Sequence, residues 1–278
     1  MSLSTADLAF VRDFVRTESA IVIDESKGYL VDSRLAPLAT ELSLGSVADV
    51  VARVRQGDRA VRAKVVDAMT TNETSWFRDV HIYRALENEV IPTLLDRRER
   101  ERSLTVWSAA CSTGQEPYTL AMLIADELAD RSDGSRWNWS ILGTDLSPTV
   151  LDQARRGVYD QLEMNRGLPA ARLVRHFTRA GAGWQVSADL RRRVQYRPLN
   201  LATAFPPMPQ ADLILLRNVL IYFDNPTKQA VLQRVLRSLK PDGYLVLGAA
   251  ESLIGVPNNL QAVRVGSLSC YQHRKAAA

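Results

Sequence analysis

Small and polar residues follow two apolar runs of the chain, at places where the strands of a parallel sheet would meet a ligand. The run Leu104–Ser108 leads into Ala109 and a turn of small residues that ends at Gly114, and Glu116 then begins a helix. Small residues let the backbone approach a ligand, and a helix N-terminus offers free N–H groups. Asp145 closes the next run, where an acidic residue of a nucleotide-binding sheet holds ribose hydroxyls. This spacing favours a ligand-binding turn over the alternative, a plain tight turn with Asp145 as a helix cap.

The turn differs from a dinucleotide-binding turn in its glycines. Only Gly114 remains of the Gly-x-Gly-x-x-Gly pattern that a pyrophosphate requires. The missing glycines weaken an interpretation with NAD or FAD, whereas a cofactor without phosphates, such as S-adenosylmethionine, tolerates the change. Glu116 could either stabilise the helix dipole or face a cationic or hydroxyl-bearing ligand. Cys111 lies in the same turn, but no histidine is nearby in sequence to act as its base, so we interpret it as a small packed residue.

A second unusual stretch, Thr70–Arg78, lies at the junction between two halves of the chain that differ in pattern. It brings together threonines, an asparagine, two aromatic residues and an arginine. Its alternative interpretation is a helix start capped by Asn72.

A third stretch places polar groups at the end of an apolar run. Arg217 and Asn218 follow the run that begins at Asp212, and Tyr222 comes four residues after Asn218. Buried polar groups need partners, so we expect a ligand or a facing carboxylate there.

The elements that must position these residues form two regions. Over residues 1–85, apolar residues recur at helical spacing without strand alternation, which predicts a bundle of about four or five short helices, and a further helix is expected over 81–98. From residue 86 onward, apolar runs alternate with helical segments, which indicates a mostly parallel sheet covered on both faces. Residues 162–193 break this alternation and are predicted to form a small insertion. The strands are expected over residues 104–108, 139–143, 194–200, 212–217 and 243–248.

Composition excludes several classes of protein. The chain has 278 residues, of which 46% are hydrophobic and 24% charged, so general disorder and collagen are excluded. The two cysteines, Cys111 and Cys270, do not indicate a disulfide framework. No secretory signal and no apolar run near the ~20 residues of a membrane helix is visible, so we expect a cytoplasmic protein without membrane insertion. The net charge of +4 permits an acidic partner without requiring nucleic acid.

The motifs together resemble those of the CheR-type chemotaxis receptor methyltransferases, in order along nearly the whole chain. The resemblance also includes Lys27, Arg34 and Leu35 in the helical region and Asn200-Leu201 after the third expected strand. These motifs are more specific than a generic nucleotide-binding turn. The segments that carry the resemblance are Thr71-Asn-Glu-Thr-Ser-Trp-Phe-Arg78, Ser108-Ala-Ala-Cys-Ser-Thr-Gly-Gln-Glu-Pro-Tyr118, Gly143-Thr-Asp-Leu-Ser147, Arg217-Asn-Val-Leu-Ile-Tyr-Phe223 and Leu239-Lys-Pro-Asp-Gly243.

The resemblance implies a fold, a reaction and a partner. The fold would be a helical N-terminal domain over residues 1–85, followed over 86–278 by a class I S-adenosylmethionine-dependent methyltransferase domain. That domain is Rossmann-like α/β with a mostly parallel sheet, and residues 162–193 would be its small inserted β-subdomain. The reaction would methylate glutamate γ-carboxylates on the cytoplasmic helices of chemoreceptors, giving methyl esters and S-adenosylhomocysteine without a metal. We expect a monomer with no nucleic-acid partner.

The resemblance also implies roles for individual residues. A glutamate with a pKa near 4.3 is ionised at pH 7 and needs no general base, so catalysis would consist mostly of positioning and desolvation. Arg78 would hold the carboxylate, and Tyr222 would lie near the transferred methyl group. The cofactor site would contain Asn72, Thr74, Arg78, Ala109, Glu116, Asp145, Asn200, Leu201, Arg217 and Asn218, with Asp145 at the ribose, Asn200 and Leu201 at the adenine, and Glu116, Arg217 and Asn218 at the methionine end.

Two expectations concern how a receptor is held. The compact stretch 177–186 looks like the shorter loop of family members that do not bind a peptide tether at the receptor's C-terminus, so we expect tether-independent action. Arg55, Arg59 and Arg62 would share one helical face if a helix spans Gly57, and that face would either meet acidic receptor helices or be a solvated surface. Two alternatives stay open for the protein: a class I methyltransferase acting on RNA or a small molecule, and a non-catalytic module that binds the cofactor and regulates a partner.

Overall fold

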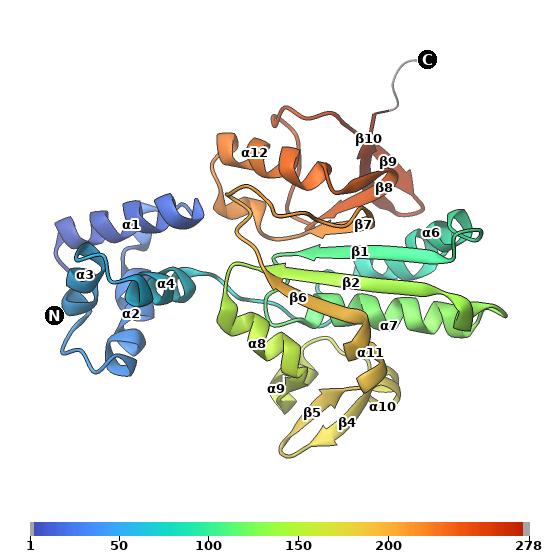
Figure 1. Ribbon diagram of the computed structural model, residues 1–278, viewed down its shortest axis with the longest axis horizontal. Coiled ribbons are helices and arrows are strands. Elements are labelled where there is room, and N and C mark those ends of the chain that lie inside the picture. Colours follow the sequence, from blue (N-terminus) through green and yellow to red (C-terminus); the bar gives the residue numbers. More distant parts are fainter. Residues whose placement is uncertain (1–2, 275–278) are drawn as a thin grey trace.

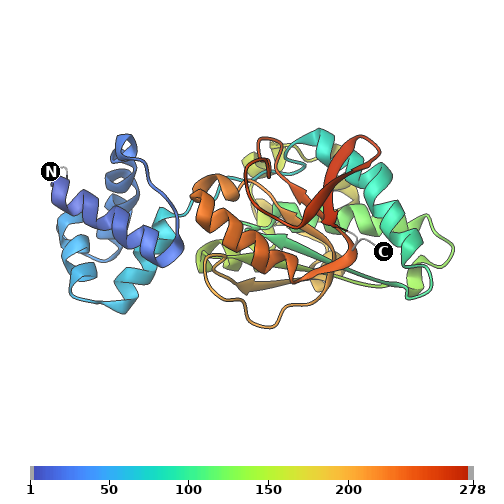
Figure 2. The same ribbon diagram turned by 90° about the horizontal axis from the view of Figure 1, so that it is seen from above.

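The computed structural model describes residues 3–274 of the chain, as a small helical domain beside a larger α/β domain (Figure 1, Figure 2). In the helical domain, Ser4, Ser46 and Asp58 accept hydrogen bonds from backbone N–H groups at three helix starts, as N-caps do. Within residues 3–274, no helix is both long enough and apolar enough to span a membrane. The helices of this domain are α1 (Thr5–Ser19), α2 (Tyr29–Glu41), α3 (Val47–Arg55) and α4 (Arg59–Met69), with a 3₁₀ turn η1 (Glu25–Lys27) before α2.

The two domains have separate cores, and the change of core comes earlier than the predicted boundary at residue 85. The core of the helical domain ends at Met69, whereas Trp76, Phe77 and Tyr83 are buried in the core of the α/β domain. The boundary in packing therefore lies between Met69 and Trp76. The predicted helix over 81–98 is present as α5 (Val80–Ala85), a π-helical turn η2 (Leu86–Val90) and α6 (Ile91–Arg97), and it packs against the larger domain.

A seven-stranded mixed sheet, in the order β6-β2-β1-β7-β8-β10-β9, forms the centre of the α/β domain. The pairs of β1 with β2 and β7, of β2 with β6, and of β7 with β8 are parallel, whereas β10 is antiparallel to β8 and β9. All five predicted strands are present, and the C-terminal hairpin was not predicted. The strands are β1 (Ser103–Ala109), β2 (Asn138–Asp145), β6 (Val194–Pro198), β7 (Ala211–Leu216), β8 (Leu239–Leu247), β9 (Leu260–Val265) and β10 (Leu268–His273).

Helices cover both faces of the sheet, as the alternation of strands and helices predicts. Consecutive residues of β7 enter different cores: Leu213 belongs to the core that includes residues of α7, and Ile214 to the core that includes residues of α12. Figure 1 shows these two helices on opposite sides of the sheet. Because both faces are covered, β7 is buried at every position and appears in the sequence as a continuous apolar run. The helices after the strands are α7 (Gln115–Ala129), η3 (Gly134–Arg136), α8 (Pro148–Arg156), η4 (Leu220–Tyr222) and α12 (Asn225–Leu236).

The predicted insertion is a small antiparallel sheet in the order β3-β5-β4, with three short helices. It begins at Val158, slightly before the predicted residue 162. Only Gly181 and Ala182 connect β4 to β5, because Ala180 pairs with Gly183. The elements are β3 (Val158–Tyr159), α9 (Gln161–Asn165), α10 (Ala170–His176), β4 (Phe177–Ala180), β5 (Gly183–Val186) and α11 (Ala188–Arg193).

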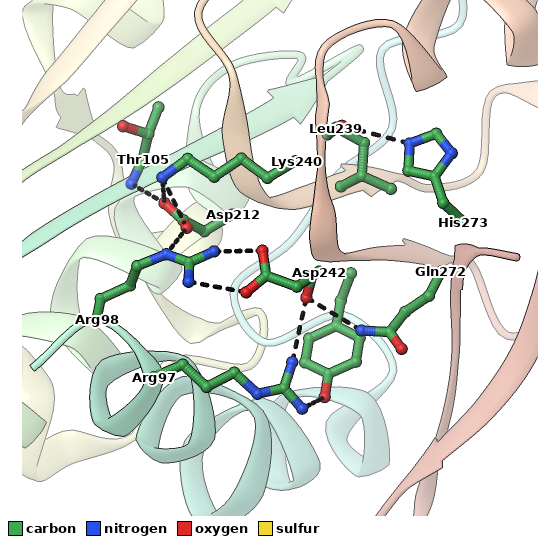
Figure 3. A network of polar contacts seen from close by, with 10 residues as sticks. Arg97, Arg98, Thr105, Asp212, Leu239, Lys240, Asp242, Gln272 and His273 are labelled. Atoms are coloured by element: carbon green, nitrogen blue, oxygen red, sulfur yellow. Dashed lines mark hydrogen bonds and ion pairs between the residues drawn. The ribbon is translucent and has the colours of Figure 1, made fainter. Parts of the chain in front are cut away.

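A buried ionic network joins the amino ends of β1, β7 and β8 (Figure 3). Asp212, which is fully buried, accepts hydrogen bonds from Arg98 Nε at 2.6 Å, from Lys240 Nζ at 2.9 and 3.0 Å, and from the backbone N–H of Thr105 at 2.8 Å. Arg98 also donates to Asp242 at 2.8 Å, and this guanidinium holds the pKa of the Asp242 carboxyl below its ordinary value. All the charges of this network are therefore paired inside the protein.

Candidate functional site

A cavity lies at the carboxyl ends of β1, β2 and β7, where the helical domain meets the α/β domain. It encloses about 930 Å³ of space between protein atoms, part of it open to solvent. All predicted cofactor-site residues except Ala109 line this cavity. Ala109 is the fully buried last residue of β1, and its neighbour Ala110 lines the cavity instead. The predicted residues that the cavity brings together are Asn72, Thr74, Arg78, Glu116, Asp145, Asn200, Leu201, Arg217, Asn218 and Tyr222.

The turn after β1 has an unusual backbone. Ala110 and Ser112 have φ angles of +60° and +50°, and Gly114, at the N-cap of α7, has a φ of +96°. A Cβ at Gly114 would lie 2.9 Å from both Ala154 Cβ and Tyr196 Oη, so a side chain does not fit there. Cys111 in this turn is buried, and burial raises the pKa of its thiol, which confirms the interpretation as a packed residue. Glycine is therefore required at this strained turn because α7 begins in close contact with Ala154 and Tyr196.

Asp145 connects the ends of β1 and β2. One carboxylate oxygen accepts from the backbone N–H of Ser112 at 2.8 Å, and the other accepts from that of Ser147 at 3.0 Å. The side chain that caps α8 is Ser147, not Asp145. Burial raises the pKa of Asp145 above its ordinary value. Each carboxylate oxygen has a further acceptor position, so Asp145 can also accept from two hydroxyls of a ligand.

Arg217 follows β7 and is almost completely buried. Its guanidinium contacts the carboxylates of Glu116 at 2.7 Å and Asp79 at 2.8 Å, which confirms the expectation of a facing carboxylate. It also donates to the backbone oxygen of Arg78 at 2.6 Å and to Tyr83 Oη at 3.1 Å. Its Nε is buried and has no partner within residues 3–274. A carboxylate in the cavity would satisfy this donor, because an unpaired buried N–H is costly.

The sequence predicts that Glu116 either stabilises the helix dipole or faces a ligand, and the structure shows a further role. One of its oxygens accepts from Ser108 Oγ at 2.8 Å, and the other accepts from Arg217. It lies in the first turn of α7, where a negative charge is favourable. Glu116 therefore orients Arg217 at the cavity wall.

The stretch Thr70–Arg78 is a loop that crosses the cavity. The helix after it begins at Val80, so Asn72 is not a helix cap and that alternative is wrong. Ser112 Oγ donates to the backbone oxygen of Asn72 at 2.7 Å, and Arg78 donates to that of Glu73 at 2.8 Å. The Trp and Phe of this loop are buried, and they anchor it to the α/β core.

The helical domain supplies part of the cavity wall. Ser19, the last residue of α1, and Ile21, just after it, line the cavity. Asn200 Nδ2 donates to the backbone oxygen of Glu18 at 2.7 Å, so its amide also binds the helical domain. The backbone N–H of Val22 donates a hydrogen bond to the backbone oxygen of Tyr222, at 2.9 Å.

The basic cluster of the helical domain differs from its prediction. Gly57, with a φ of +82°, separates α3 from α4, so no single helix presents Arg55, Arg59 and Arg62. Arg55 pairs with Asp7 at 3.0 Å and Arg62 pairs with Glu18 at 2.6 Å, and their guanidinium groups lie over the rings of Phe10 and Phe14. Arg59 is exposed and makes no ion pair within residues 3–274. None of the three lines the cavity.

Sequence reasoning missed several residues of the site. Asp79 and Ser112 lie next to or inside predicted motifs, so their position was a usable signal. Ser19 and Ile21 have no such signal, because only folding brings the end of α1 to the sheet. Within residues 3–274, no group of three or more His, Cys, Asp or Glu side chains is arranged to hold a metal ion.

The site fits the cofactor that the sequence suggested. Asp145 offers acceptors for hydroxyl groups, Arg217 Nε offers a donor for a carboxylate, and the small residues Ala110 and Ser112 of the turn after β1 line the cavity. The sheet carries its cavity at the carboxyl ends of parallel strands, where open α/β folds bind ligands. Fold and site together define a Rossmann-like, S-adenosylmethionine-dependent methyltransferase.

Comparison with known proteins gives the family. Residues 6–70 match the all-alpha domain of CheR methyltransferases, and residues 72–267 match their S-adenosylmethionine-binding domain. The chain is 42% identical over 266 residues to chemotaxis protein methyltransferase 1 of Pseudomonas aeruginosa, covering 95% of this chain and 96% of the relative. It is 43% identical over 253 residues to the chemotaxis protein methyltransferase of Vibrio parahaemolyticus, covering 90% of each. The chain belongs to the CheR family of chemotaxis protein methyltransferases.

Proposed function

We propose that the chain transfers methyl groups to glutamate γ-carboxylates on the cytoplasmic domains of chemoreceptors, and that it does so in the cytoplasm. The observation that carries this proposal is the single cavity that unites the Asn72–Arg78 loop with the cofactor-site residues of the sheet. A methyltransferase acting on RNA or a small molecule would need the sheet residues but has no evident use for the helical domain and this loop.

The cofactor-binding roles follow from the polar groups of the cavity. Asp145 accepts from the ribose hydroxyls, and Arg217 Nε donates to the methionine carboxylate. Glu116 and Asn218 complete the methionine end, and Asn200 and Leu201 flank the adenine. Asn72 and Thr74 close the cavity from the loop side.

The chain's own task in the reaction is to position the receptor glutamate and exclude water. S-adenosylmethionine supplies an electrophilic methyl group on a positively charged sulfur. The receptor carboxylate is already ionised, so no proton has to be removed from it. Because a negative and a positive charge are neutralised together, a site with little water favours the transfer.

Two half-buried side chains at the cavity are suited to this task. Arg78 donates one hydrogen bond, to Glu73, and its other N–H groups have no partner within residues 3–274, so they are available to hold the receptor carboxylate. Tyr222, on the opposite loop, limits the space beside the reacting groups.

The mode of receptor binding is inferred from two structural features and from the family resemblance. The two-residue turn between β4 and β5 supports methylation that is independent of a receptor tether. A further part of the proposal, a monomer as the active form, is carried over from the family resemblance. Arg59, the member of the basic cluster without an ion pair in the described residues, is the side chain that meets acidic receptor helices.

The test is incubation with methyl-labelled cofactor and receptor cytoplasmic fragments. We expect alkali-labile label on glutamates, equally with fragments that have or lack the C-terminal residues. Label on RNA from an extract, with receptors unlabelled, would support the first alternative. Tight cofactor binding by calorimetry without transfer to any receptor would support a regulatory module instead.

A further inference from the structure

The carboxylate of Glu251 does not line the cavity, but it binds the loop that forms one of the cavity walls. Glu251 lies in the segment after β8 and is not among the residues that line the cavity. Its two oxygens accept three backbone N–H groups: Asn218 at 2.6 Å, Leu220 at 2.8 Å and Gly248 at 3.0 Å. Two of these donors belong to the loop after β7, and the third follows β8. A single side chain thus joins the carboxyl ends of two adjacent parallel strands.

The loop turns sharply at a residue that the Glu251 carboxylate holds. Asn218 has a φ of +57°, in the left-handed region, which asparagine adopts more readily than most residues with a side chain. The short 3₁₀ turn η4 follows and carries Tyr222 to the cavity. Hydrogen bonds to a carboxylate are about twice as strong as those between neutral groups, so three of them can hold this conformation.

Gly248 makes the close approach possible. A Cβ at this position would lie 2.8 Å from Asn218 Nδ2, 2.9 Å from a carboxylate oxygen of Glu251 and 3.0 Å from the backbone nitrogen of Asn218. A side chain at this position would displace the Asn218 amide or the Glu251 carboxylate. Glycine therefore lets the three residues meet closely.

We propose that Glu251 is a positioning residue for methyl transfer: it fixes the loop 218–222 so that Asn218 and Tyr222 form the cavity wall. This inference rests on the function proposed above for that cavity. It adds a residue that acts on the reaction only through the backbone of the loop. The backbone N–H of Val22, in the helical domain, binds the other end of this loop at Tyr222. Glu251 therefore fixes the position of the loop relative to the helical domain.

The test compares Glu251→Gln with the wild-type chain. A glutamine has one acceptor oxygen and an NH₂ group that faces a backbone N–H, so at least one of the three hydrogen bonds is lost. We expect hydrogen exchange of the Asn218 and Leu220 amides to rise by about tenfold or more, as for a lost charge-assisted hydrogen bond. We expect kcat for receptor methylation to fall by a similar factor, with less than about a threefold change in KM for the receptor.

A matched control and a second variant make the test decisive. Glu127→Gln removes a similar half-buried carboxylate, paired with Arg131 at the far end of α7, and should change neither the loop amides nor kcat. Gly248→Ala, whose Cβ would displace the Glu251 carboxylate and the Asn218 amide, should reproduce the Glu251→Gln result even if that variant folds poorly. Unchanged loop exchange in Glu251→Gln, or an unchanged kcat in both variants, would overturn the proposal. If the wild-type chain methylates no receptor, the proposed function fails, while amide exchange and the affinity for S-adenosylhomocysteine still test the role of Glu251.

Discussion

The two ends of strand β7 carry similar charged groups in opposite arrangements. At the amino end, Asp212 is surrounded by Arg98, Lys240 and a backbone N–H, and every charge is paired inside the protein (Figure 3). At the carboxyl end, Arg217 is paired with Glu116 and Asp79, but its Nε faces no partner in the described residues. The first network is complete without a ligand, and the second is not. A complete network serves stability, whereas an incomplete network beside a cavity serves binding.

The largest expected effect would come from breaking the complete network. Asp212→Ala leaves the two cations of Arg98 and Lys240 without their buried partner, which costs about 3–5 kcal/mol of the free energy of unfolding. Denaturant unfolding measures this loss. The affinity of the folded variant for S-adenosylhomocysteine, measured by calorimetry, should stay unchanged. A loss of affinity with normal stability would reverse the roles assigned to the two ends.

Breaking the incomplete network should affect binding more than stability. Arg217→Met keeps the length of the side chain but removes the donor for the ligand carboxylate, so affinity should fall by roughly tenfold to a hundredfold, corresponding to about 1.5–3 kcal/mol. The free energy of unfolding should fall by less than in Asp212→Ala, because Glu116 lines the cavity and Asp79 is partly exposed, whereas Asp212 is fully buried. Wild-type affinity in this variant would remove Arg217 from the cofactor site.

The ribose assignment gives a somewhat smaller effect. Asp145→Ala removes the carboxylate that accepts hydrogen bonds from the backbone N–H groups of Ser112 and Ser147. The affinity for S-adenosylhomocysteine should fall by about tenfold. Calorimetry again gives the measurement. Asp13→Ala, which changes an exposed acidic residue of the helical domain that does not line the cavity, is the control.

Measuring the affinity for S-adenosylhomocysteine over a range of pH tests whether binding depends on the charge of Asp145 or only on its shape. Burial raises the pKa of Asp145 above the ordinary value of an aspartate, so the carboxylate takes up a proton at a higher pH than a free aspartate would. The ionised form is the better acceptor for hydroxyls, so affinity should be constant well above the raised pKa and should weaken as the pH falls through it. Asp145→Asn should bind weakly at every pH, and a pH-independent wild-type affinity would contradict the assignment.

The smallest effect concerns the surface of the helical domain. Arg59→Glu should raise the KM for a receptor fragment by about two- to threefold at low salt, the size typical of exposed ion pairs, and the effect should vanish at high salt. Arg100→Glu makes the same charge change at an exposed site after α6 and is the control. Equal KM values for both variants and the wild type would make Arg59 an ordinary solvated residue.

The sequence predicted most of the sheet because buried parallel strands are continuous apolar runs, as β7 is. It did not predict the β9–β10 hairpin. Most residues of these two strands are half-buried or exposed, so the strands carry no continuous apolar run. The site motifs were found because polar residues interrupt apolar runs at strand ends. The pairing of Arg55 and Arg62 with residues of α1 was not predictable, since it depends on how helices distant in sequence pack together. The same holds for Ser19 and Ile21.

The contact between Asn200 and Glu18 has a consequence for the synthesis of the chain. The two residues are 182 positions apart, yet they meet at the wall of one cavity. The helical domain has its own core and is complete soon after it leaves the ribosome. At about 5–20 residues per second, it must wait roughly 10–40 s before the opposite wall is translated. A nascent chain therefore acquires its cofactor late, and an incomplete translation product has no finished pocket.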